Sequence, residues 1–187
     1  MAIELATLTD LKIMLDISGT SNDTKLTLIR DGVTTSIEQY IGRMLTYAQY
    51  TDIVRIGAIS QTMIALKALP IESVDDINIV SDGADYSEDL EEDTDFLITN
   101  YGIKLLFKPL MSMINITYTG GYEETADVPD AIKRAALLQT VFEFSSGATT
   151  GATSISTEGG SVQYPKLGLL NEVKNLLNEY KHPFMVI

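Results

Sequence analysis

The sequence TYTGGYEETADVPDAIKRAALL, Thr117 to Leu138, runs from a strand pattern through a glycine pair into a helix that opens with a proline. Its first residues are threonine and tyrosine, which are typical of β-strands. Pro129 then marks a helix start, because proline in the first helical turn gives up no hydrogen bond. The chain therefore changes from strand to helix within this stretch, with strand patterns before it and helical patterns after it.

Apolar residues at helical spacing occur on both sides of a central strand region. They predict helices over about residues 7–17, 23–44, 129–145 and 166–181. Thr7 or Thr9 is the expected N-cap of the first helix. The segment between the last two helices, about 146–163, is rich in Gly, Ser and Thr, which predicts a flexible loop, either a plain linker or a segment that orders in an assembly.

From about residue 50 to residue 119 the apolar period shortens to two. The runs YTDIVRI, SVDDINIV, GIKLLF and INITYT are rich in Val, Ile, Thr and Tyr, and turn residues separate them. Short strands with tight connections favour antiparallel hairpins. The order of elements predicts an α+β fold: a small helical bundle of two N-terminal and two C-terminal helices with an inserted block of antiparallel β-hairpins, in one domain over 1–187.

Composition limits the function classes. The 187 residues carry a formal net charge of -13, which disfavours a binding site for nucleic acid that relies on clustered Lys and Arg. There is no Cys and only one His, so thiolate chemistry and multi-His metal sites are excluded. No basic leader or long apolar run is present, and we expect an untargeted protein made in the cytoplasm, with no membrane partner.

The glycine pair Gly120-Gly121 stands between a strand and a helix, a position that can hold phosphate. Here, however, Glu123, Glu124, Asp127 and Asp130 follow without any Lys of the kind that binds phosphate. We therefore predict a structural turn, with glycine at positive φ.

An acidic run from Glu72 to Asp95 holds 11 acidic residues and no basic residue. The candidate acidic channel or surface patch consists of Asp82, Asp85, Glu88, Asp89, Glu91, Glu92 and Asp93. The sequence around Asp93 departs from the pattern of an EF-hand loop, so we expect the acidic run to form a solvated loop. A loose cation site, or a surface facing DNA or a basic partner, is left open.

The chain ends in four apolar residues, where termini are usually exposed. Phe184, Met185, Val186 and Ile187 are either part of the core or a docking segment for the portal or another subunit. The nearby His182 is expected at the surface or at a helix C-cap. No catalytic motif is present, and no catalytic, cofactor-binding or metal residue is predicted.

The whole pattern resembles the head-to-tail connector family of tailed double-stranded DNA bacteriophages, also called adaptor or head-completion proteins. The resemblance rests on the order and spacing of LTDLKIMLDI, SIEQYIGRML, LPIESVDDINIV, DFLITNYGIKLLF, INITYTGGYEETADVPDAIKRAALL and YPKLGLLNEVKNLLNEYK. Within these, Tyr40-Ile41-Gly42-Arg43 is similar to the family's turn after the helix pair, and Val128 to Ala135 to the opening of its third helix. The resemblance to the family covers about Leu5 to Lys181.

The resemblance implies a non-enzymatic part of the virion neck, made in the bacterial host cytoplasm. Subunits of the family close into a ring of roughly a dozen copies through heterologous contacts. The implied partners are the portal protein, a stopper or tail-completion protein, further copies of the chain, and double-stranded DNA that passes through the ring without sequence-specific binding. The alternatives are a stopper or tail-completion protein of the same neck region, and a small cation-binding domain that uses the 72–95 acidic run.

Overall fold

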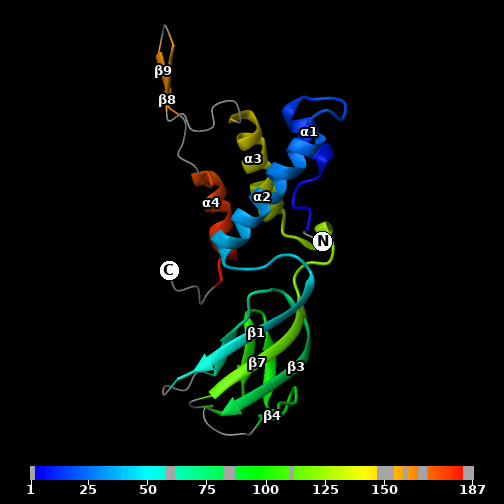
Figure 1. The fold of residues 1–187 in the computed structure, drawn as a ribbon, viewed down its shortest axis with the longest axis vertical. Coiled ribbons are helices and arrows are strands. Elements are labelled where there is room, and N and C mark those ends of the chain that lie inside the picture. The colour runs from blue at the N-terminus through cyan, green and yellow to red at the C-terminus, as the bar shows by residue number, and fades with distance from the viewer. Residues whose placement is uncertain are drawn as a thin grey trace. The chain divides into compact units, whose positions relative to one another are not determined.

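The computed structural model describes residues 3–57, 62–81, 87–109, 112–146, 154–157, 160–163 and 168–182. It confirms the predicted α+β class, with four α-helices and short antiparallel sheets among these residues (Figure 1). The chain divides into two compact units. The β unit comprises Met1–Ile3, Gly42–Glu124 and His182–Ile187, and the helical unit comprises Glu4–Ile41 and Thr125–Lys181. That the whole chain is one domain stays a prediction.

The helical unit contains α1 (Leu8–Leu15), α2 (Asp23–Ile41), α3 (Asp130–Ser146) and α4 (Asn171–Leu177), with short 3-10 helices at Thr125–Asp127 and Asn178–Tyr180. Thr7 caps α1 as predicted, because its side chain accepts a hydrogen bond from the Asp10 amide at 3.1 Å. The helices end earlier than the predicted bounds in α1, α2 and α4. In α2 the end coincides with Gly42, whose φ of 68° ends the helix.

Apolar side chains spaced by three and four residues form the core of the helical unit. Leu26, Val33 and Ile37 of α2 and Ile132 and Ala135 of α3 are fully buried. Gln139 of α3 is also buried, and its amide joins α3 to the segment before α4: its oxygen accepts from the Leu170 amide at 2.9 Å, and its nitrogen donates to the Gly168 carbonyl at 3.3 Å. The unit is therefore held by packing along helices, with a few polar contacts at their ends.

Part of the predicted flexible loop has regular structure. β8 (Ser154–Thr157) and β9 (Gly160–Gln163) pair antiparallel in a two-stranded ribbon. The predicted loop therefore contains a short hairpin, in which Ile, Val and Thr favour extended backbone. The flexibility of the segment stays a prediction.

The β unit contains two sheets. The larger has the order β1 (Ala48–Ile56), β7 (Ser112–Gly120), β3 (Ile71–Ser81) and β4 (Ser87–Asp89). The smaller has the order β2 (Met63–Ala65), β6 (Gly102–Leu105) and β5 (Phe96–Thr99). All strand pairs in both sheets are antiparallel, as predicted.

The prediction of successive hairpins is only partly right. β3 with β4 and β5 with β6 are hairpins, but β7 lies between β1 and β3 and pairs with both along most of its length (Figure 1). These two pairings join segments far apart in the sequence, and turn signals give no information about such partners. β4 was not predicted, because its sequence, Ser-Glu-Asp, lies inside the acidic run and lacks apolar alternation.

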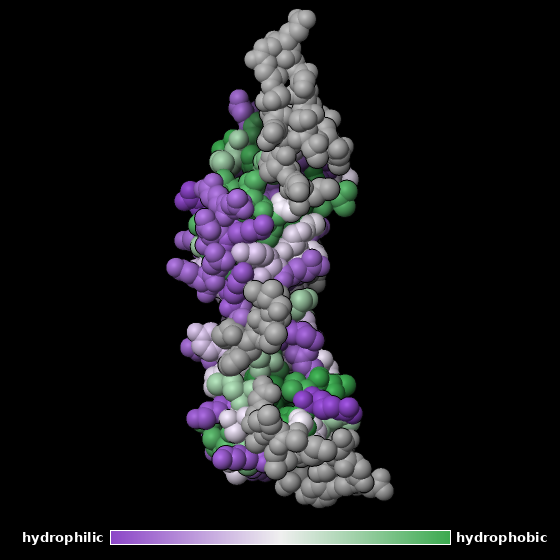
Figure 2. Space-filling view, turned by 90° about the vertical axis from the view of Figure 1, so that its left-hand side faces the viewer, coloured by the Kyte–Doolittle hydropathy of each residue, from purple (hydrophilic) through white to green (hydrophobic). Residues whose placement is uncertain are grey.

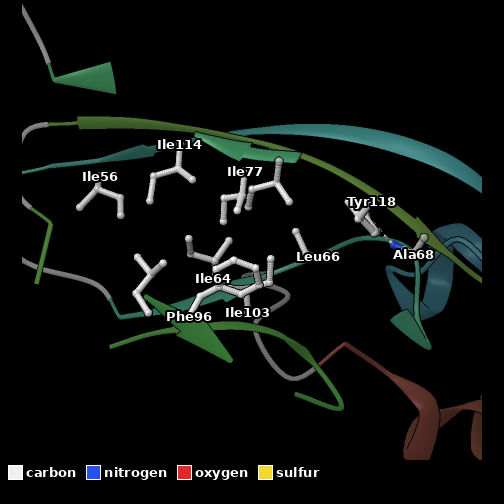
Figure 3. Close-up of a cluster of buried hydrophobic side chains, with 11 residues drawn as sticks. Ile56, Ile64, Leu66, Ala68, Ile77, Phe96, Ile103, Ile114 and Tyr118 are labelled. Carbon is white, nitrogen blue, oxygen red and sulfur yellow. Dashed lines mark hydrogen bonds between the residues drawn. The ribbon is translucent and has the colours of Figure 1, made fainter. Parts of the chain in front are cut away.

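The core of the β unit lies between the two sheets (Figure 3). Ile56, Ile77, Ile114 and Tyr118 point inward from the large sheet, and Ile64, Phe96 and Ile103 come from the small one. Burying each large aliphatic side chain stabilises the fold by roughly 1.5–3 kcal/mol. Because inward residues alternate along most of each strand, the remaining residues form an outer face on the opposite side of each sheet.

The glycine pair ends β7 where three backbone segments meet. The Gly121 amide donates to the Pro70 carbonyl at 2.9 Å, and the Tyr122 amide donates to the Leu45 carbonyl at 2.8 Å. Gly121 has φ of 102°, and a Cβ at this position would overlap the Thr46 carbonyl group. The predicted turn with glycine at positive φ is confirmed at Gly121, and the reason is the close approach of backbone.

Candidate functional site

The described acids from Asp89 to Asp93 lie at the edge strand β4 and in the turn after it. Asp89 ends β4, and Glu91, Glu92 and Asp93 lie in the turn that leads to β5, all with exposed side chains. The turn is closed by backbone bonds, from the Asp95 amide to the Glu91 carbonyl at 2.8 Å and from the Asp93 amide to the Phe96 carbonyl at 2.9 Å. Of the other predicted residues, Asp82 and Asp85 lie outside the described residues, as does the side chain of Glu88.

Two further acids that were not singled out in the sequence lie beside this turn. Asp75 and Asp76 of β3 line a hollow of about 180 Å³ together with Asp89 and Glu92. β3 has register shifts between Ile71 and Ser73 and between Val74 and Asp76, so Asp75 and Asp76 are both exposed in spite of being consecutive. Sequence alternation alone could not have indicated this, because a bulge breaks the period of two.

Asp75 is held in place by three donors on the outer face of the large sheet. Its carboxylate accepts from Gln49 Nε2 at 2.9 Å, from Ser73 Oγ at 3.1 Å and from Thr119 Oγ1 at 3.2 Å. The hydrogen bond from Gln49, followed by those from Ser73 and Thr119, lowers the pKa of Asp75 below its ordinary value of 3.8. Asp75 therefore stays ionised under mildly acidic conditions.

Tyr47 and Glu72 form a second polar contact close to this face. The Tyr47 hydroxyl donates to Glu72 Oε2. This hydrogen bond, with partial desolvation and the negative charge of Glu72, raises the pKa of Tyr47 to about 12. Tyr47 is thus a neutral hydrogen-bond donor on an otherwise acidic edge.

A buried polar network lies inside the β unit. Tyr118, which is fully buried, donates to Asp52 Oδ2 at 3.1 Å and accepts from the Ala68 amide at 3.0 Å. Lys67 Nζ forms an ion pair with Asp52 Oδ1 at 3.0 Å. Burial raises the pKa of the Tyr118 hydroxyl above its ordinary value. The network satisfies its buried groups and joins β1, β7 and the segment after β2, so its role is structural.

His182 is buried, which makes the expectation of a surface or capping histidine wrong. It is only 8% exposed, and its Nε2 lies 3.1 Å from the Leu66 carbonyl oxygen. Burial is the main cause that lowers its pKa below the ordinary value of 6.5. The residue after the last helix therefore packs into the β unit, a contact over 116 residues of sequence that local patterns cannot indicate.

The remaining predicted surfaces are only partly described. Phe184, Met185, Val186 and Ile187 lie outside the described residues. Over the ranges that the structure describes, no three His, Cys, Asp or Glu side chains are placed to hold a metal ion. In those same ranges no helix is long and apolar enough to cross a membrane. What the described part offers is a set of exposed faces on the β unit, one of them acidic.

Comparison with known proteins supplies the family. A family model described as "Head completion protein" matches residues 4–182, nearly the whole chain. The chain belongs to the head completion protein family. This confirms the resemblance drawn from the motifs, whose predicted extent of about Leu5 to Lys181 agrees closely with the match.

Solved structures extend the family assignment to the fold. A chain in the "Virion of native gene transfer agent (GTA) particle" is 13% identical with a TM-score of 0.63, over 100% of this chain and 95% of that one. A chain in the "Neck of empty GTA particle computed with C6 symmetry" is 13% identical with a TM-score of 0.62, over 95% and 90%. A third, in the "Neck of native GTA particle computed with C12 symmetry", is 12% identical with a TM-score of 0.55, over 87% and 84%.

At these identities the likeness shows a shared fold over the full length of this head completion family member. Among curated proteins no match is found.

Proposed function

We propose that this chain is a structural protein of the virion neck of a tailed bacteriophage or a related particle. Copies of it form a ring between the portal vertex and the tail or stopper, and the ring extends the DNA channel after packaging. The chain acts in the ring through contacts between proteins, and this role requires no catalytic site or cofactor.

The match to the head completion family carries this proposal. The fold likeness adds to it, since chains of the same fold occur in necks computed with C6 and C12 symmetry. In a cyclic ring every subunit uses one face toward one neighbour and a different face toward the other. A chain with two unlike outer faces on one unit suits such an arrangement.

The acidic turn supports a place beside moving DNA. Glu91, Glu92 and Asp93 are exposed and consecutive, so they repel a phosphate backbone. A surface of this charge lets DNA slide, whereas a basic surface would hold it. In the ring, the turn faces the channel, together with Asp82, Asp85 and Glu88 from the candidate patch.

The portal and the tail-side partner bind surfaces other than the acidic turn. The apolar tail, Phe184 to Ile187, is the proposed docking segment for the portal, because four apolar residues at a chain end can bind a groove on a partner. A chain truncated after Pro183 keeps its melting temperature and binds the portal protein more weakly. A large loss of melting temperature would place the tail in the core instead.

The channel assignment is tested by reversing charge in the turn. The variant Glu91→Lys, Glu92→Lys, Asp93→Lys binds double-stranded DNA with a salt-dependent affinity, while the natural chain does not. A control variant, Glu172→Lys with Glu179→Lys, changes exposed acids of the helical unit. In assembled particles the turn variant slows DNA release. Equal DNA release from both variants, or a ring in which Lys104, Lys108 or Lys133 lines the channel, would contradict the assignment.

A further inference from the structure

The outer face of the large sheet is polar and acidic. Residues paired across β1, β7 and β3 lie in rows, of which Thr51, Thr117 and Asp76 form one and Ile53, Asn115 and Asn78 the next, extended by Asp89 of β4. Hydrogen bonds link side chains along the face: Thr51 with Thr117 at 3.3 Å, and Asn115 Nδ2 to Asn78 Oδ1 at 3.1 Å.

The same face carries an exposed apolar residue. Ile53 is 68% exposed in the middle of β1, beside this ordered polar lattice. Among the described side chains of the face, Asp75, Asp76 and Asp89 are negative, and one exposed cation, Arg55, lies near the end of β1. The hydrogen-bonded side chains are ordered before any partner arrives, which lowers the entropy cost of binding.

The outer face of the small sheet and of the segment after β6 carries two lysines and several apolar residues, with Asp95 opposite Leu106. From Ile103 onward burial alternates, so Lys104, Leu106 and Lys108 point away from the core in succession. Lys104 of β6 lies between Met63 of β2 and Leu97 of β5, both half-buried. Leu106 is 48% exposed. Within the described ranges neither Lys104 nor Lys108 takes part in an ion pair.

These two faces are complementary in charge and similar in construction. Each has exposed apolar side chains next to charged groups, acidic on one and basic on the other. Figure 2 shows such mixing on one side of the β unit, where hydrophobic and hydrophilic residues lie next to one another at the surface. Since the faces are on opposite sides of one core, a single copy cannot bring them together. Two copies can.

We infer that the small-sheet face, centred on Lys104, Leu106 and Lys108, docks onto the large-sheet face, centred on Ile53, Asp76 and Asp89, of a second copy of this chain. Because the two faces differ and point away from each other, the contact is head-to-tail, and its repetition gives a ring when the rotation between neighbouring copies closes. The inference rests on the proposed ring function and specifies its subunit contact. It uses the strand part of the acidic run and leaves the turn at Glu91–Asp93 free for the channel.

Cross-linking tests this contact directly, because the chain contains no Cys. The double variant Ile53→Cys, Leu106→Cys, treated at high protein concentration with a short bis-maleimide, gives a ladder of covalent oligomers. An equimolar mixture of the two single variants gives the mixed dimer in excess over either homodimer. The matched control is Ile13→Cys, Leu28→Cys, which places thiols at two exposed apolar residues of the helical unit.

The outcomes separate the contact from the proposed function. A ladder from the β-unit pair and none from the control supports the inference. A ladder from the control pair alone keeps a self-associating protein but overturns this contact. No ladder from either pair, with the natural chain monomeric both alone and on its portal, overturns the ring function and the contact together.

Charge reversal adds a second test. Lys104→Glu with Lys108→Glu, or Asp76→Lys with Asp89→Lys, weakens self-association by on the order of tenfold or more, because like charges then meet. A one-to-one mixture of the two variants restores assembly, since each intact face finds an intact face and each reversed face a reversed one. Circular dichroism shows that the variants are folded. Unchanged assembly by both variants, or failure of the folded mixture to assemble, would overturn the inference.

Discussion

The helical unit and the β unit of this protein are stabilised in different ways. In the helical unit the elements follow from local features, such as the Thr7 cap and the stripe from Leu26 to Ile37, although α2 and α3 then pack together across the sequence. In the β unit the decisive contacts join distant segments: Tyr118 with Asp52 over 66 residues, His182 with Leu66 over 116, and β7 with strands on either side. Local patterns can therefore specify the elements of the first unit, whereas the strand order of the second depends on contacts between distant segments.

The two units are expected to differ most in how replacing a glycine changes their stability. Replacing Gly121 with Ala is expected to destabilise the protein by at least about 2 kcal/mol, because φ of 102° is unfavourable for Ala and the new Cβ overlaps backbone at Thr46. Gly32 is exposed within α2, and a Cβ added there would meet nothing within 4 Å. Gly32→Ala should stabilise by roughly 0.5–1 kcal/mol. Urea unfolding of both variants measures this, and effects of the same sign would contradict the distinction.

Removing a tyrosine hydroxyl is expected to give a smaller difference in stability between the two units. Tyr118→Phe removes a donor to Asp52 and leaves the buried Ala68 amide without its acceptor, which should cost roughly 1–3 kcal/mol. Tyr40→Phe in the helical unit removes an exposed bond to Asn178 Oδ1 and should cost less than about 1 kcal/mol. Thermal unfolding compares the two variants. An equal loss would mean that the buried network contributes no more than a surface bond.

These differences explain which features the sequence could predict. The four helices follow from periodicity and caps, and the positive φ of Gly121 from the glycine pair. No local sequence pattern indicates that β7 lies between β1 and β3. β4 could not be predicted either, because the acidic segment Ser87–Asp89 does not have a strand pattern. Asp75 and Asp76 are both exposed because of a bulge in β3, and His182 is buried beside the Leu66 carbonyl, which is distant in the sequence.

The N-cap of α1 tests how far local interactions support the helical unit. Thr7→Ala removes the acceptor of the Asp10 amide and should lower stability by about 1 kcal/mol. Thr7→Ser keeps the hydroxyl and should lose only a small part of that. Equal losses in chemical denaturation for the two variants would show that the methyl group, and not the cap, matters.

The smallest expected effect is on the pH dependence of the β unit. Burial lowers the folded pKa of His182, so its contribution is fully present above the unfolded value of 6.5 and is lost as pH falls from there toward the folded pKa. As His182 is the single His, His182→Gln should flatten stability in this window. Urea midpoints between about pH 7.5 and about pH 5.5, one unit on either side of the reference pKa, test it. If His182→Gln leaves the dependence of the urea midpoint on pH unchanged, the assignment to His182 is contradicted.

We propose that this head completion family member builds a ring on the portal. The most direct measurement is the native mass of the purified protein, alone and after addition of its portal protein. A complex that contains the portal and many copies of the 20.5 kDa chain, with cyclic symmetry in electron micrographs, is the predicted result. A chain that stays monomeric and leaves the mass of the portal unchanged would contradict it.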